Sequence, residues 1–210
     1  MLQSPAARTI AQPNLRQLLE HLYQGRNLSG FRAGQPIAMN PQEIWIVCRG
    51  VVQLSTLYPS GDEALLGLAG PSMPFGMPLT LIYPYQASAL SDVDVMGLTM
   101  MEIEQSPTLA REIFHHLGRR LRQTEAMLAM VGCRRVEDRL RQLLLLLQME
   151  VGQPTAMGTR LSVRLTHQHL ASAIGTTRVT VTRLLGQMKE DGRLIVDENR
   201  HIVLPTDVTL

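Results

Sequence analysis

The chain has 210 residues, of which 45% are hydrophobic, and its formal net charge is +2. This length and apolar content suffice for one domain or two small ones with real cores, and the low net charge means that any basic surface must be local. Two cysteines, Cys48 and Cys133, cannot form a disulfide framework or a four-thiolate cluster, and no run of about 18 apolar residues is present to span a membrane.

The first residues carry little structural signal. Residues 1–13 lack the apolar core of a signal peptide, so we expect a flexible tail on a cytoplasmic protein. Residues 14–23 place four leucines at helical spacing, which predicts a short helix.

Residues 31–98 have the texture of a β domain. The runs IWIVC, VVQLSTLY, ALLGLA and DVDVMGL are short, rich in branched side chains, and separated by glycines and prolines. This pattern is typical of an antiparallel barrel or jelly roll. We therefore expect a β jelly-roll domain over residues 14–107.

From Met101 onward the apolar period becomes helical. The pattern predicts a short helix before Pro107, a long helix over residues 108–133 and another helix from about residue 134 to residue 151. In the long helix, side chains recur at alternating spacings of four and three, as in a coiled-coil seam of about two heptads; they are Leu117, Leu121, Thr124, Leu128 and Val131. The seam could join two copies of the chain or pack on the β domain. The arginines of residues 119–141 lie among acidic residues, which favours solvated helices over a nucleic-acid patch.

Residues 165–194 contain two short helices joined by a glycine turn. Thr166 can cap the first helix, Gly175 provides the turn, and Thr176 or Thr177 can cap the second. On a helical wheel, the second helix separates an apolar arc from an opposite polar arc; the apolar arc comprises Val181, Leu184, Leu185 and Met188, and the opposite arc comprises Arg178, Val179, Thr182 and Arg183.

These proportions predict a helix-turn-helix. The second helix of that motif enters the major groove of DNA, where arginine bonds to guanine and an apolar side chain meets a thymine methyl group. The alternative is a pair of packed helices with solvated arginines. Residues 152–165 read as loop and strand, and residues 194–196 and 201–204 predict a hairpin, which completes a winged domain over residues 134–210.

The stretch TTRVTVTRLLG (residues 176–186) closely resembles the recognition helix of the cyanobacterial nitrogen-control regulators in the CRP/FNR family of transcription regulators. The stretch WIVCRGVVQLSTLYPSGDEALLGLAGPSMPFG (residues 45–76) is similar to the effector-domain jelly roll of that family. Together with the helices between them, the resemblance covers about residues 31–205. It implies an α+β fold with an N-terminal cyclic-nucleotide-binding-like β jelly roll, a dimerisation helix over residues 108–133 and a C-terminal winged helix-turn-helix domain.

The resemblance also implies functional residues. Arg178, Val179 and Arg183 would read bases in a palindrome of the GTA…TAC type. Four positions match family contacts to the DNA phosphates, namely Thr166, Gln168, Thr177 and Thr180. The seam of the long helix would join a homodimer, and RNA polymerase would be a partner.

The effector is the least determined feature. Members that bind cyclic nucleotides supply an acidic residue and an arginine after a Phe-Gly pair, but residues 74–90 contain neither, so cyclic AMP is disfavoured. Arg120 and Glu125 match the helix pair with which the nitrogen regulators hold 2-oxoglutarate. The matching barrel arginine falls in what looks like a deletion between Ile82 and Ala87, so this ligand is disfavoured too. The candidate effector pocket comprises Phe75, Gly76, Met77, Tyr83, Tyr85, Arg120 and Glu125.

Other interpretations of these residues stay open. Arg120 and Glu125 could lie on a solvated or interfacial side of the helix, and His115 and His116 could serve a haem sensor, although exposed histidines are commoner. The two cysteines disfavour an iron-sulfur cluster, and we expect neither a metal nor another cofactor.

Two further functional classes compete with a regulator. An enzyme is disfavoured because the sequence has no glycine-rich phosphate loop, HExxH or GxSxG motif, or Cys-His metal spacing. A ligand-binding sensor or interaction protein with little DNA specificity is the other alternative.

Overall fold

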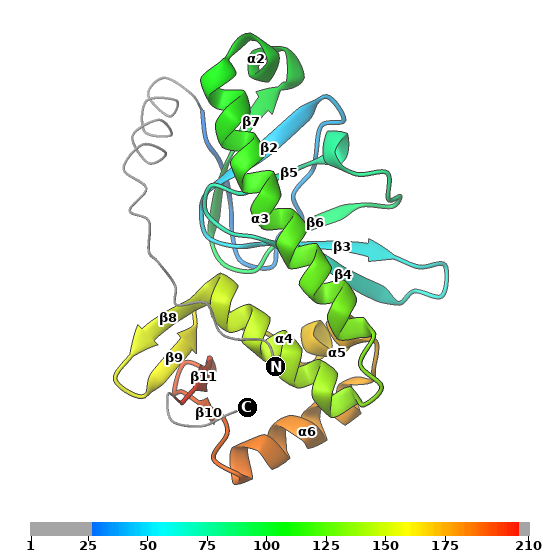
Figure 1. Cartoon of the computed structure of the whole chain (residues 1–210), viewed down its shortest axis with the longest axis vertical. Helices are drawn as coiled ribbons and strands as arrows, with labels where there is room; N and C mark the ends of the chain where they lie inside the picture. Colours follow the sequence, from blue (N-terminus) through cyan, green and yellow to red (C-terminus); the bar gives the residue numbers. More distant parts are fainter. Residues whose placement is uncertain (1–26, 206–210) are drawn as a thin grey trace.

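The computed structural model describes residues 27–205. The expected tail (residues 1–13) and the expected helix over residues 14–23 lie outside the described residues. Figure 1 shows a β domain packed along one long helix, α3, and a smaller, mainly helical domain at the C-terminal end of that helix. Within residues 27–205, no helix is long and apolar enough to cross a membrane.

The β domain consists of two antiparallel sheets. One sheet has the strand order β1 (Ser29–Phe31), β7 (Val93–Thr99), β2 (Glu43–Arg49), β5 (Pro74–Phe75), and the other has the order β4 (Glu63–Ala69), β3 (Val52–Leu57), β6 (Gln86–Ala89). A short 3-10 helix, η1 (Met77–Leu79), follows β5. Residues from both sheets share one core, which includes Val47, Leu54, Phe75, Ala87 and Val95.

Strands β2 and β7 are buried on both faces because apolar residues occupy neighbouring positions along them. Since side chains alternate between the faces of a strand, Val47 and Val95 point into the core between the sheets, and Ile46 and Met96 point out of it. Helices α2 (Met100–Gln105) and α3 (Pro107–Val131) cover the outer face with buried side chains such as Ile113.

The C-terminal part begins with α4 (Val136–Val151), followed by β8 (Gly152–Thr155) and β9 (Gly158–Leu161). Helices α5 (His167–Ile174) and α6 (Arg178–Glu190) come next, and β10 (Ile195–Val196) and β11 (Ile202–Leu204) end the described part. These last strands join β9 and β8 in one sheet of order β10-β11-β9-β8. The elements confirm the predicted α+β fold, with helix ends one or two residues from those expected.

One hydrophobic core connects the C-terminal part to the β domain. Val51 and Leu68 of the β domain and Met130 of α3 pack in the same cluster as leucines of α4, α5 and α6. The backbone N–H of Leu68 donates to Gln123 Oε1 of α3 at 2.8 Å, and Arg119 of α3 pairs with Glu150 of α4 at 2.9 Å. Helix α5 is therefore fixed against strand β4.

Candidate nucleic-acid interface

Helix α5 begins with a reciprocal cap. The Thr166 hydroxyl accepts from the backbone N–H of His169 at 3.1 Å, and His169 Nδ1 accepts from the backbone N–H of Thr166 at 3.4 Å. A histidine therefore fills the position that glutamate or glutamine usually takes in a capping box. Its pKa is lowered, chiefly because burial disfavours the charged ring, so the neutral ring that can accept this bond is favoured.

The turn between α5 and α6 depends on a glycine and an arginine. Gly175 has φ 62° and ψ 54°, a left-handed conformation that glycine adopts without steric cost. Arg139 of α4 donates to the carbonyl oxygen of Ile174 at 2.8 Å, where the helix dipole favours a positive charge. Arg139 is therefore an exception to the expectation that the arginines of residues 119–141 lie on solvated helix sides.

Helix α6 separates a buried side from an exposed one. Of the two threonines that could cap it, Thr177 does so, because its hydroxyl accepts from the backbone N–H of Thr180 at 3.2 Å. The whole predicted apolar arc is buried, namely Val181, Leu184, Leu185 and Met188. Arg178 and Arg183 are exposed, and Val179 is 78% exposed. An exposed valine of this degree on a charged face has no packing role in the protomer.

The polar side chains around the starts of α5 and α6 differ in exposure. Thr166, Gln168 and Thr177 are exposed, whereas Thr180 is half-buried. The Thr177 and Thr180 hydroxyls lie 3.0 Å apart, and His167 Nδ1 lies 2.7 Å from the Thr182 hydroxyl. The first contact lies within the start of α6, and the second holds the start of α5 against α6.

A groove of about 960 Å³ separates these helices from the β10–β11 hairpin. Among the described residues, four cationic side chains and no carboxylate line it; the cations are Arg164, Arg178, Lys189 and Arg200. Thr166 and Gln168 also line the groove, while Val179 and Arg183 lie outside it on α6. The groove is therefore electrostatically suited to a polyanion such as nucleic acid.

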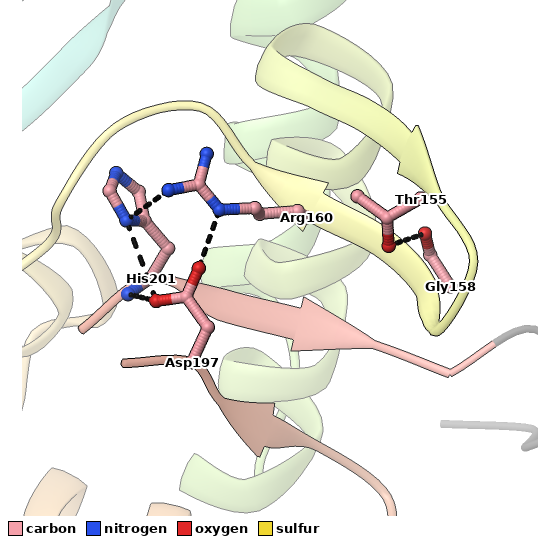
Figure 2. Close-up of polar contacts among 5 residues, drawn as sticks. All are labelled: Thr155, Gly158, Arg160, Asp197 and His201. Carbon is pink, nitrogen blue, oxygen red and sulfur yellow. Dashed lines mark hydrogen bonds and ion pairs between the residues drawn. The ribbon is translucent and has the colours of Figure 1, made fainter. Parts of the chain in front are cut away.

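A polar cluster holds the hairpin in place. In Figure 2, Arg160 of β9 points toward Asp197 and His201 at the two ends of the hairpin turn. Arg160 Nε donates to Asp197 Oδ2 at 2.6 Å, Arg160 Nη2 lies 2.6 Å from His201 Nδ1, and the His201 backbone N–H donates to Asp197 Oδ1 at 2.7 Å. The hydrogen bond from Arg160 lowers the pKa of Asp197, and burial lowers the pKa of His201. The cluster anchors the turn that carries Arg200.

Comparison with known proteins identifies this arrangement. A family model described as a Crp-like helix-turn-helix domain matches residues 138–206. The chain is 37% identical over 172 residues to the regulatory protein CysR of Synechococcus elongatus, covering 80% of this chain and 79% of the relative. The chain belongs to the CRP/FNR family of transcription regulators.

Other relatives agree in sequence and fold. The global nitrogen regulator of Nostoc sp. is 33% identical over 195 residues, covering 88% of this chain and 85% of the relative. A CRP-family regulator from Thermus thermophilus has the same fold, with a TM-score of 0.72 at 21% identity, over 84% of this chain and 91% of that one. As a CRP/FNR regulator, the chain is a DNA-binding protein and not an enzyme.

In this CRP/FNR chain, the seam of α3 is largely uncovered. Leu121, Leu128 and Val131 are 60%, 73% and 59% exposed, Thr124 is exposed, and Leu117 is half-buried. Phe114, which is 78% exposed, lies seven residues before Leu121 and extends the seam by one position. Phe114 was not among the expected seam residues, although its heptad spacing is the signal that marks it.

A cavity of about 320 Å³ lies between the β domain and α3 of this CRP/FNR chain. Its lining residues come from β4, β5, the end of η1, the segment between η1 and β6, and α3; they are Leu66, Pro74, Phe75, Leu79, Thr80, Ile82, Tyr85, Leu117, Arg120, Leu121 and Thr124. Phe75, Tyr85 and Arg120 were expected there. Leu79 at the end of η1 and the irregular residues Thr80 and Ile82 were not, because residues 79–82 have no periodic pattern.

The other pocket residues expected from the sequence lie elsewhere. Tyr83 is 88% exposed and does not line the cavity. Met77 lines a separate hollow, Gly76 is buried beside β2, and Glu125 is exposed on α3. The structure therefore brings together only part of the expected set.

One half-buried cation and one buried titratable group stand out on α3. Burial lowers the pKa of Arg120, and its Nη1 is buried without a protein hydrogen-bond partner. His116 is 6% exposed, both of its ring nitrogens lack a protein partner, and burial together with His115 and Arg119 lowers its pKa to about 4. His115 is exposed, so the expectation of exposed histidines is correct for one of the pair and wrong for the other.

Proposed function

We propose that this regulator acts as a homodimer that binds a GTA…TAC palindrome and contacts RNA polymerase. In each protomer, Arg178 and Val179 would read the GTA half-site, and Arg183 would contact a neighbouring base. The exposed side of α6 carries this proposal, because its arginines and valine are fixed by a capped helix start and have no packing role.

Helix ends and hydroxyls support contacts to the DNA backbone. The capped starts of α5 and α6 direct backbone N–H groups outward, and such groups favour phosphate oxygens. We assign phosphate contacts to Thr166, Gln168, Thr177 and Thr180. The basic groove beside them would add attraction that is independent of sequence.

The uncovered seam of α3 supports the dimer. Exposed apolar side chains at heptad spacing are stabilised when a second helix covers them. Pairing α3 with its copy would relate two α6 helices by two-fold symmetry, and successive major grooves lie about 34 Å apart. We place the effector site in the cavity beside α3, because Leu117, Leu121 and Thr124 belong to both the cavity and the seam.

Replacing Arg178 with alanine tests base reading. We expect the variant to lose about 1–3 kcal/mol of binding free energy per GTA half-site, or about 5- to 150-fold in affinity for each, and to lose its preference for guanine at that position. Arg32→Ala is the matched control, since it removes the same charge from an exposed site in the β domain. A selection on random duplexes measures preference, and an Arg178→Ala protein that recovers the original site with unchanged preference would refute the assignment.

A further inference from the structure

The cavity beside α3 contains a single charge. Arg120 is the only ionic residue among the described residues that line it. The neighbouring carboxylate of Glu150 already pairs with Arg119 at 2.9 Å. Among the described lining residues, Arg120 therefore has no carboxylate partner, and Tyr85 is the polar group of the walls that interacts with it.

The guanidinium of Arg120 is also short of hydrogen-bond acceptors. Its Nη1 is buried and has no protein partner. This nitrogen lies close to the backbone of β4, since it is 3.4 Å from the position that a Cβ atom would take if Gly67 had a side chain. A buried charged donor without an acceptor costs free energy, and since Nη1 itself has almost no accessible surface, an anion in the cavity would offset the charge through the other nitrogens of the guanidinium.

The remaining walls are mostly apolar. Leu66, Phe75, Ile82 and Leu117 present hydrocarbon, whereas Thr80, Tyr85 and Thr124 carry the only hydroxyls among the lining residues. Burial raises the pKa of the Tyr85 phenol, which therefore keeps its proton at neutral pH and can donate it. A volume of about 320 Å³ is at the small end for ligand sites.

We propose that this cavity binds a small monocarboxylate with a branched or aromatic apolar body. The carboxylate pairs with the Arg120 guanidinium and accepts from the Tyr85 hydroxyl, while the body lies against the leucine and phenylalanine walls. The inference deepens the proposed function, on which it rests, by assigning a ligand class to its effector site.

Charge and polarity exclude the neighbouring ligand classes. A dicarboxylate would leave its second charge against hydrocarbon with no cation to offset the loss of hydration. A neutral molecule would leave the Arg120 charge uncompensated. One negative charge on an apolar body matches the walls.

Calorimetric titration of the full-length protein with isovalerate and with phenylacetate tests the proposal. Isovaleramide and phenylacetamide keep the shape of these probes without the charge, and 2-oxoglutarate adds a second charge. We expect at least one monocarboxylate to bind, its amide to bind about tenfold more weakly or worse, and 2-oxoglutarate to bind more weakly than the monocarboxylate.

Three variants locate the site. Arg120→Gln should weaken the monocarboxylate about tenfold and leave the amide unchanged, whereas Arg122→Gln, an exposed arginine on the same helix, should change neither. Ile82→Trp should abolish binding by filling the cavity from its exposed side, with Arg120 intact. This variant keeps the test valid if Arg120→Gln fails to fold.

The outcomes separate this proposal from the proposed function. Operator binding by the same preparation tests the regulator by itself. If the protein binds the palindrome but neither carboxylate binds at about 10 mM, the ligand class is refuted and the regulator stands. The proposed ligand class would also be refuted if the acid and its amide bind with equal affinity, if 2-oxoglutarate binds more tightly than the monocarboxylate, or if Ile82→Trp binds as well as the parent.

Discussion

Replacing His116 with leucine should stabilise the protein, and most strongly in mild acid. His116 follows Leu109 and Ile113 on the buried side of α3, and neither of its ring nitrogens has a protein partner. Leucine has a similar volume and no polar atom. Removing unsatisfied polar atoms of this kind is worth about 1–3 kcal/mol at neutral pH.

The pH dependence follows from the lowered pKa. His116 titrates near pH 4 in the folded protein and near its ordinary value of 6.5 in the unfolded chain. As the pH falls below 6.5, the unfolded chain takes up a proton that the folded protein refuses, so unfolding becomes more favourable until the pH reaches about 4. Between about pH 7 and about pH 5, this single group removes roughly 2 kcal/mol of stability.

Urea denaturation at one protein concentration measures both effects. We expect the stability difference between His116→Leu and the parent to grow by roughly 2 kcal/mol from about pH 7 to about pH 5. His115→Gln is the control and should keep most of the parent's acid sensitivity, since burial is the main cause of the shift at His116. A difference that stays constant with pH would refute the burial argument.

Further predictions concern the seam and the two helices of the DNA-binding motif. The double variant Leu121→Ala, Leu128→Ala should dissociate the proposed dimer, because each leucine that the partner buries contributes roughly 2–5 kcal/mol to its stability. Sedimentation measures the association state, and a double variant that is still dimeric at low concentration would contradict the seam. Val179→Glu should move base preference at its position toward a G·C pair, because glutamate accepts from cytosine N4, and selection that returns the parent site would count against it. Thr177→Ala should lower the free energy of unfolding by about 1 kcal/mol through loss of the α6 cap, as urea denaturation would measure. Thr176→Ala is the control and should lower it by less, since Thr176 does not cap the helix; equal losses would exclude the cap.

The sequence was most informative where its signals are local. The caps, the turn at Gly175 and the apolar arc of α6 each arise within a few residues, and the structure contains all of them. Contacts between distant segments were less predictable. Arg139 bonds to Ile174, 35 residues away in the sequence, and nothing near either residue indicates the pairing.

The cavity shows the same limit. Phe75, Tyr85 and Arg120 were expected in the pocket, but Leu79 ends the short helix η1 and Ile82 lies on the irregular segment after it, whose course depends on the packed sheets. The burial of His116 was not predictable either, because the side of α3 that faces inward is set by the position of β2 and β7. Helical spacing alone does not say which side of a helix meets a sheet.

Strand β4 gives the cavity and the DNA-binding motif a common wall. Leu66 lines the cavity, and Leu68, two residues further along the strand, packs in the core that contains Leu170 of α5. Because protein interiors are close-packed and transmit strain, a displacement of β4 at Leu66 reaches α5 directly, without bending α3 or the junction between α3 and α4. If the proposed effector occupies the cavity, β4 thus offers a route from the ligand to the helix pair within a single chain.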